Sequence, residues 1–121
     1  LPQNHYRYPQ QAVGETYYEE ALRSIVGETK GPTAEHRCQA ELRPYDTNEH
    51  DPMAVAVVVA GRTVAHLDRH EARVHREALA ARGIPGASTV CSALIAGGGI
   101  VDGKTRAFSV LLDPLSPRDS F

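Results

Sequence analysis

The chain has 121 residues, of which 41% are apolar and 23% are charged, and its formal net charge is −2. This length and composition predict one globular domain that can bury a core without disulfide or metal cross-links. The small acidic excess argues against broad, salt-dependent binding of nucleic-acid phosphates, although it allows a small site that works by stacking. No apolar run approaches the roughly 20 residues that span a membrane, so we expect a cytoplasmic protein without a membrane partner.

The domain is expected to occupy residues 12–113, between flexible tails at residues 1–11 and 114–121. Residues 11–13 are predicted to form a short strand. The first residue is Leu1 rather than Met, which indicates a piece of a longer protein or a trimmed chain. Arginine far outnumbers lysine and alanine is plentiful, a composition that favours a bacterial source with GC-rich DNA.

A helix is predicted from Thr16 to Val26, because Thr16 and Glu19 match the capping-box pattern and Gly27 supplies a stop. The residues at i, i+3, i+4 and i+7 spacing, which predict its buried face, are Tyr18, Ala21, Leu22 and Ile25. Tyr17 lies off this face, so we expect its ring to point to solvent or to a ligand.

Three strands and a polar loop are predicted in the middle of the chain. Residues 34–43 alternate polar and apolar side chains, which predicts a half-buried strand with Cys38, Ala40 and Leu42 facing inward. The loop 45–52 is rich in turn-forming residues and leads into the apolar strand 54–59, which a turn at residues 60–62 connects to a strand at 63–67. A polar loop next to a buried strand is a favourable place for a site on a rigid base.

A second helix is predicted from Asp68 to Arg82, where Asp68 and Glu71 repeat the N-cap-plus-acid pattern and Gly83 follows the end. Its inward face is expected to consist of Ala72, His75, Ala78 and Leu79. A basic stripe on an adjacent face, at i, i+4 and i+7 spacing, consists of Arg69, Arg73 and Arg76.

Residues 89–96 and 105–112 are predicted to form a final hairpin, joined by a flexible glycine-rich loop at residues 97–104. The predicted order is β-α-β-β-β-α-β-β. This order indicates a mainly β protein with two α-helices, built as a small modified OB-like or SH3-like β-barrel.

Several patterns that could hold a metal or a phosphate are weak. Gly97-Gly98-Gly99 lacks the spacing of a phosphate-binding loop and does not open a helix. His66, His70 and His75 lie close in sequence, but the first ends a strand and the others lie on a helix, so no zinc site is expected. We therefore predict no metal and no cofactor.

Two interpretations stay open beside these. Cys38 and Cys91 fall in predicted strands, where they would be small buried apolar residues or, as the alternative, a disulfide pair. The carboxylates of Asp46, Glu49 and Asp51 could hold Mg²⁺ for phosphodiester hydrolysis, although acidic loop residues more often form turns.

One set of residues is more informative, because strand pairing can bring its members to one rim of a barrel. The loop before one strand can lie near the end of its antiparallel neighbour. We therefore expect the loop with Asn48, His50 and Asp51 to share one rim with His66 and Arg69. The first helix, which carries Tyr17 and Tyr18, could cover this rim. Aromatic faces, an amide, a carboxylate and a cation suit a nucleotide end, and ordinary surface and core roles are the alternative.

Three blocks of the sequence resemble the HIRAN domain: VGETYY at residues 13–18, NEHDPMAVAV at residues 48–57 and GRTVAHL at residues 61–67. They include the pattern N-x-x-D-x-x-A-V and a following V-x-[HY]-L, and the resemblance extends from about Val13 to Leu112. It implies a modified OB-like β-barrel that serves as an accessory module of SNF2-type helicase-like proteins, or as a stand-alone or fused bacterial domain.

The resemblance also implies a non-catalytic domain that binds the 3′ end of single-stranded DNA in DNA repair or replication-fork processing. Tyr17 and Tyr18 would stack on bases, and Asp51 would accept a hydrogen bond from the free 3′ hydroxyl. The two residues expected to shape the pocket are Asn48 and His50. The two expected to contact the DNA backbone are His66 and Arg69. A monomer with a fused or partner helicase or nuclease is expected.

A protein-interaction or structural module without DNA binding is the alternative. The net acidity, Thr16 where DNA-binding members of the family carry a basic residue, and His50 where tyrosine is frequent favour this alternative. A nuclease is the third hypothesis.

Overall fold

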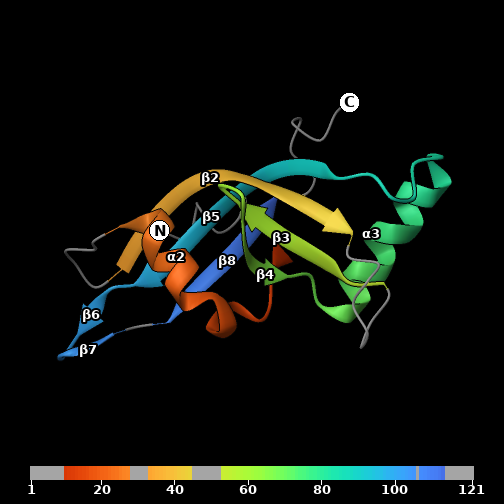
Figure 1. The fold of residues 1–121 in the computed structure, drawn as a ribbon. Coiled ribbons are helices and arrows are strands. Elements are labelled where there is room, and N and C mark those ends of the chain that lie inside the picture. The colour runs from red at the N-terminus through yellow and green to blue at the C-terminus, as the bar shows by residue number, and fades with distance from the viewer. Residues whose placement is uncertain (1–9, 28–32, 45–52, 106, 114–121) are drawn as a thin grey trace.

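The computed structural model describes residues 10–27, 33–44, 53–105 and 107–113. Within these residues the chain is mainly β, with two α-helices and one curled six-stranded antiparallel sheet, so the predicted fold class is confirmed. No helix in the described ranges has both the length and the apolar character that crossing a membrane requires. Figure 1 shows the sheet arching across the molecule.

The large sheet has the strand order β1-β8-β5-β2-β3-β4. Its strands in chain order are β1 (Gln10–Gln11), β2 (Thr33–Pro44), β3 (Val55–Val59), β4 (Arg62–His66), β5 (Thr89–Gly98) and β8 (Phe108–Asp113). β1 lies within the stretch assigned to the N-terminal tail, and it pairs with β8 from Gln10 opposite Leu112 to Gln11 opposite Leu111. The long pairing of β2 with β5 forms the centre of the sheet.

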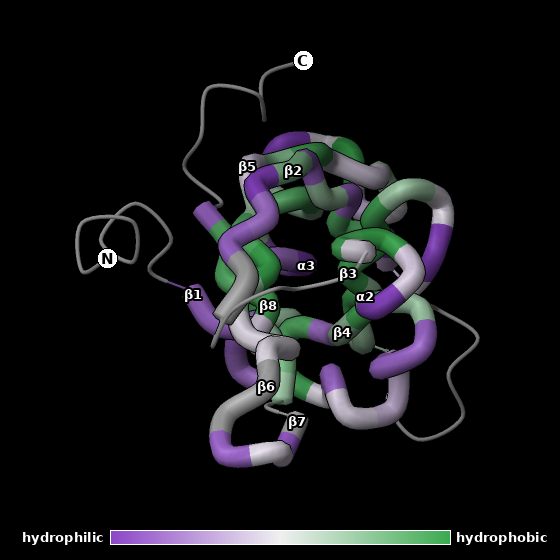
Figure 2. The backbone as a smooth tube through the Cα atoms, turned by 90° about the vertical axis from the view of Figure 1, so that its left-hand side faces the viewer, coloured by the Kyte–Doolittle hydropathy of each residue, from purple (hydrophilic) through white to green (hydrophobic). Residues whose placement is uncertain are grey.

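The concave side of the sheet encloses the core. The predicted alternation in β2 is confirmed, because Ala40 and Leu42 are buried and Cys38 packs, partly buried, against the core. Figure 2 shows apolar segments along the sheet strands and polar ones at the turn between β6 and β7. The largest fully buried side chains of the core cluster are Leu22, Leu42, Ile95, Leu112, Val55, Val57, Val64 and Val110.

All five residues of β3 are buried, which explains why its sequence is continuously apolar rather than alternating. The turn to β4 uses Ala60 (φ 52°) and Gly61 (φ 79°), and two positive φ angles suit a tight two-residue hairpin. The pairing of β3 with β4 shifts register between Val57 and Val58. This bulge leaves Val64 without a direct partner and lets two consecutive residues, Val64 and Ala65, both be buried.

The first helical region differs from the prediction. It begins with a 3-10 helix, η1 (Glu15–Tyr18), followed by α2 (Glu19–Val26), and neither is capped by a side chain. The capping box of Thr16 and Glu19 was therefore wrong. Gly14, at φ 82°, occupies the N-cap position instead, because its left-handed backbone turns the chain directly from a strand pairing into η1.

The buried face and the end of α2 are as predicted. Ala21 and Leu22 are buried, and Tyr18 and Ile25 pack partly buried against the core. Gly27, at φ 81°, follows the last residue and donates its amide to the carbonyl of Arg23 at 2.8 Å. The helix thus covers part of the core through the predicted stripe.

α3 (Arg69–Ala81) begins as predicted, because the Asp68 side chain accepts a hydrogen bond from the Glu71 amide at 2.7 Å. Ala72 and Leu79 are buried, but Ala78 is exposed, so its inclusion in the inward face was wrong. Consecutive helical residues point about 100° apart, so Ala78 can face solvent while the next residue, Leu79, is buried. Figure 1 places α3 at one end of the sheet, away from α2, where only a narrow face of the helix is covered.

The glycine-rich connection after β5 is more ordered than the predicted flexible loop. It contains a small ribbon of β6 (Ile100–Val101) and β7 (Lys104–Thr105). Gly97 and Gly98 continue β5 with positive φ angles of 95° and 75°, and a Cβ at either one would collide with Ala107 or Phe108. The Phe108 ring also contacts the Arg23 guanidinium, whose Cζ lies over the ring at 5.2 Å from its centroid.

Candidate functional site

Two predicted site residues, Tyr18 and His66, contact each other. Their ring centroids are 5.6 Å apart, within the range of aromatic contacts, and the ring planes are inclined by 49°. Tyr18 comes from the end of η1 and His66 from the end of β4. The pair therefore joins the N-terminal helical region to the edge strand of the sheet.

The backbone of His66 is held by Val13. Val13 donates its amide to the His66 carbonyl at 2.8 Å, and His66 donates its amide to the Val13 carbonyl at 2.9 Å. The next residue, Gly14, lies close to the His66 ring, since a Cβ built on it would be 3.8 Å from Nδ1. His66 is thus fixed through both its main chain and its side chain.

Burial lowers the pKa of His66 below its ordinary value. The imidazole is therefore neutral at neutral pH, and it offers a ring face and a hydrogen-bonding nitrogen rather than a positive charge. This differs in character from the phosphate contact that the family resemblance implies for His66, which would favour a cation.

Tyr17 exposes 88% of its surface, as expected for a residue off the apolar stripe of the helix. Val13, which precedes the same turn, is 43% exposed. An aromatic face and an aliphatic side chain are thus accessible on the segment that leads to the partly buried Tyr18–His66 contact. Isolated exposed apolar residues are normal on protein surfaces, but an almost fully exposed tyrosine next to a rigid pair is a suitable stacking surface.

Arg69 is exposed and is the first residue of α3, three positions after His66. Three residues span at most about 11 Å, so the Cα atoms of the two residues lie within that distance. The intervening Asp68 caps the helix and fixes its start. A cation is therefore placed near the neutral histidine by the shortness of the β4–α3 connection.

Asn48, His50 and Asp51 lie outside the described residues, as do Asp46 and Glu49. The strand that follows them, β3, begins next to His66, and the strand that precedes them, β2, ends opposite the start of β3. Pro44 pairs with Val55, and Ala56 pairs with His66. The entrance and exit of the predicted loop therefore lie at the His66 end of β4, which is the end that the sequence analysis assigned to the site.

The alternative metal and disulfide interpretations gain no support from the described residues. Among them, no three histidine, cysteine, aspartate or glutamate side chains gather in a way that could hold a metal ion. Cys38 and Cys91 are not joined by a disulfide, and burial raises the pKa of Cys38 to about 11. His75, one of the three histidines considered for zinc, has its pKa lowered by burial and by the nearby Arg76.

The structure adds two residues that the sequence analysis did not identify. Val13 holds His66, and the Glu15 carboxylate accepts a hydrogen bond from the Val110 amide of β8 at 3.1 Å. Both contacts join segments that are far apart in sequence, and no local pattern signals such a pairing. Together they anchor the turn that carries Tyr17.

Comparisons with protein-family models, with curated proteins and with solved structures gave no match.

Proposed function

We propose that this domain is a non-catalytic nucleic-acid-binding module that recognises single-stranded DNA ends with a free 3′ hydroxyl. It would serve DNA repair or replication-fork processing as part of a larger protein, as its resemblance to HIRAN implies. The observation that carries the proposal is the exposed ring of Tyr17, which directly precedes Tyr18 in η1, together with the contact of Tyr18 with His66.

Stacking suits this site better than phosphate binding alone. Base–aromatic stacking contributes about 1–3 kcal/mol per base and needs no basic surface, which agrees with a net charge of −2. A neutral His66 adds a ring and a hydrogen-bonding nitrogen, and Arg69 adds one exposed cation. In the proposed complex the Asp51 carboxylate accepts a hydrogen bond from the 3′ hydroxyl. The same carboxylate would repel a terminal phosphate.

The proposal is tested with two short oligonucleotides that differ only in a 3′ hydroxyl or a 3′ phosphate. The hydroxyl form is expected to bind more tightly, and Asp51→Ala should reduce this preference. Equal or tighter binding of the phosphorylated oligonucleotide would contradict the mechanism. The measurement is fluorescence anisotropy at a fixed salt concentration, because affinities for nucleic acid depend strongly on salt.

Tyr17 offers a matched pair of variants. Tyr17→Ser removes the ring and should weaken binding by about 1–3 kcal/mol, whereas Tyr17→Phe keeps the ring and should retain most of the affinity. Because Tyr17 is 88% exposed, neither variant is expected to disturb the core. If Tyr17→Ser bound as tightly as the unchanged protein, stacking on Tyr17 would be excluded.

A protein-interaction module is the second candidate. It is favoured by the exposed Val13 and Tyr17, since a tyrosine and an aliphatic side chain also suit a protein interface. This candidate predicts that no oligonucleotide binds at physiological salt. It also predicts that Val13→Asp and Tyr17→Ser abolish binding of the same protein partner.

A further inference from the structure

Positive charge is concentrated on α3 and its C-cap. Four arginines and two glutamates lie between Arg69 and Arg82, so this segment carries a formal charge of +2 in a chain whose net charge is −2. The rest of the chain is correspondingly acidic. A polyanion that approaches the domain would therefore be drawn to α3 rather than to the sheet.

Three of these arginines form one stripe along the helix, Arg69, Arg73 and Arg76. Arg69 and Arg73 are exposed, and Arg76 is partly buried at the border of the covered face. At 1.5 Å per residue the stripe is about 10 Å long. This length corresponds to about three phosphate spacings of a nucleic-acid strand, since the charges of one strand are about 3.4 Å apart in B-form DNA.

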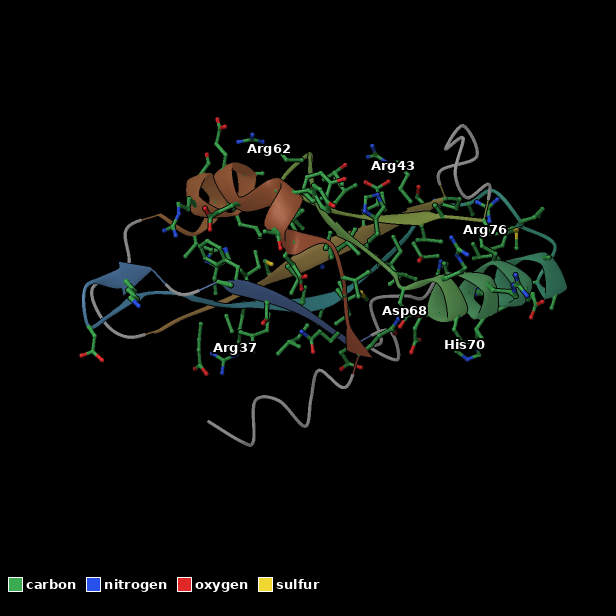
Figure 3. All side chains as sticks on the ribbon, turned by 90° about the horizontal axis from the view of Figure 1, so that it is seen from below. Arg37, Arg43, Arg62, Asp68, His70 and Arg76 are labelled. Carbon is green, nitrogen blue, oxygen red and sulfur yellow. The ribbon has the colours of Figure 1, made fainter. Side chains whose placement is uncertain are left out.

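The stripe starts close to the candidate site and leads away from it. Arg69 follows His66 by three residues, while Arg76 lies about two helical turns farther along α3. Figure 3 shows α3 extending from the end of the sheet, with Asp68 at its start and Arg76 and His70 on opposite sides of the helix. A strand whose end lies at Tyr17 and His66 would reach the helix through its next nucleotides.

We propose that the arginine stripe of α3 binds the phosphates of the single strand that leads to the bound end. This inference rests on the proposed function, and it extends that function from the terminal nucleotides to the strand behind them. Arg69 joins the two parts, and Arg73 is the exposed residue in the middle of the stripe. The partner is a nucleic-acid backbone, because guanidinium groups bind phosphates well and contacts to phosphates carry no base information.

The experiment compares oligonucleotides of 4 and 16 nucleotides that share the same four nucleotides at a free 3′ end. Binding to the full chain is measured between 50 and 200 mM salt. The longer oligonucleotide should bind more tightly and lose affinity more steeply with salt. Arg73→Ala should lower the salt slope for the longer oligonucleotide by about 0.7, so that its loss of affinity over this range is about threefold smaller.

Arg62→Ala is the matched control, because it removes the same charge from another exposed site. Arg62 lies at the start of β4, at the opposite end of that strand from His66, and Figure 3 shows it far from α3. Its affinities and salt slope should equal those of the unchanged protein. Alanine is the most favourable residue in a helix, so Arg73→Ala is expected to preserve α3.

The outcomes separate this inference from the proposed function. Equal affinity for the two lengths, or equal effects of Arg73→Ala and Arg62→Ala, would overturn the role of the stripe while leaving 3′-end recognition intact. A gain with length that depends on Arg73, without a preference for a 3′ hydroxyl over a 3′ phosphate, would support the stripe and contradict end recognition. Absence of binding by both oligonucleotides would overturn both.

Discussion

Val13 and His66 are paired through two backbone hydrogen bonds, of 2.8 and 2.9 Å, although 53 positions of the sequence separate them. Val13 follows β1 at one edge of the sheet, and His66 ends β4 at the other edge. The pairing therefore joins the two edges of the curled sheet. It also determines where the following turn, and with it Tyr17, is held.

Replacing Val13 with proline should destabilise the domain by about 1–3 kcal/mol, because proline cannot donate the hydrogen bond to the His66 carbonyl. Chemical denaturation measures the change. Val13→Thr is the control, since threonine keeps the amide and a β-branched side chain at a position that is 43% exposed, and it should change stability by less than about 0.5 kcal/mol. Equal stability of the two variants would show that the pairing contributes nothing.

Stability should fall as the solution is acidified below the unfolded-state pKa of histidine, about 6.5. Burial lowers the pKa of His66 in the folded protein, so between that lowered value and 6.5 the unfolded chain binds more protons. The stabilisation is complete above pH 6.5 and is lost as the pH falls toward the folded pKa. The free energy of unfolding should therefore decrease between pH 7.5 and pH 5.

His75 contributes to the same pH dependence, because burial and Arg76 lower its pKa as well. Unfolding of His66→Gln and His75→Gln across this range separates the two contributions. Each variant should show a smaller decrease than the unchanged protein. A full decrease in both variants would assign the effect to other groups.

Gly98→Ala should destabilise the domain more than Gly103→Ala. Both glycines have φ 75°, so a side chain strains both backbones alike, by about 1–3 kcal/mol. A Cβ at Gly98 would also collide with the Phe108 ring, whereas one at Gly103 meets no atom within 4 Å. The difference between the two unfolding free energies measures the steric part, and equal values would mean that Phe108 moves aside without cost.

Cys38 should resist thiol reagents in the native protein at pH 7–8. Burial raises its pKa to about 11, so very little of the reactive thiolate is present, and Cys91 is fully buried. Labelling with a thiol-specific chromophore should become rapid only in denaturant. Because no disulfide joins the two residues, a reductant should leave the unfolding free energy unchanged, and a reductant-dependent loss of stability would contradict the structure.

The elements that were predicted well are those with a local signal. The apolar stripe of Tyr18, Ala21 and Leu22 is set by helical spacing, and the alternation around Ala40 is set by strand geometry. The N-cap at Asp68 likewise needs only its own neighbours. These patterns were sufficient for the fold class.

The errors arose where distant segments decide the local conformation. Thr16 has the chemistry of a cap, but the pairing of Val13 with His66 fixes the chain before it, and Gly14 makes the turn. Gly98 has the local sequence of a flexible loop. Its glycine is required because the Phe108 ring of another strand leaves no room for a side chain, and no local pattern shows this. Of the predicted site residues, Tyr18 and His66 contact each other, while Asn48, His50 and Asp51 lie outside the described residues.

The pairing of β1 with β8 has a consequence for how the domain joins other polypeptide. Gln10 lies opposite Leu112, and paired residues of antiparallel strands have Cα atoms about 5 Å apart. The first and last described strands of the domain therefore place residues 10 and 112 side by side. Inserted into a surface turn of a host protein, the domain would leave the two ends of that turn almost as close as before, as a tight hairpin does.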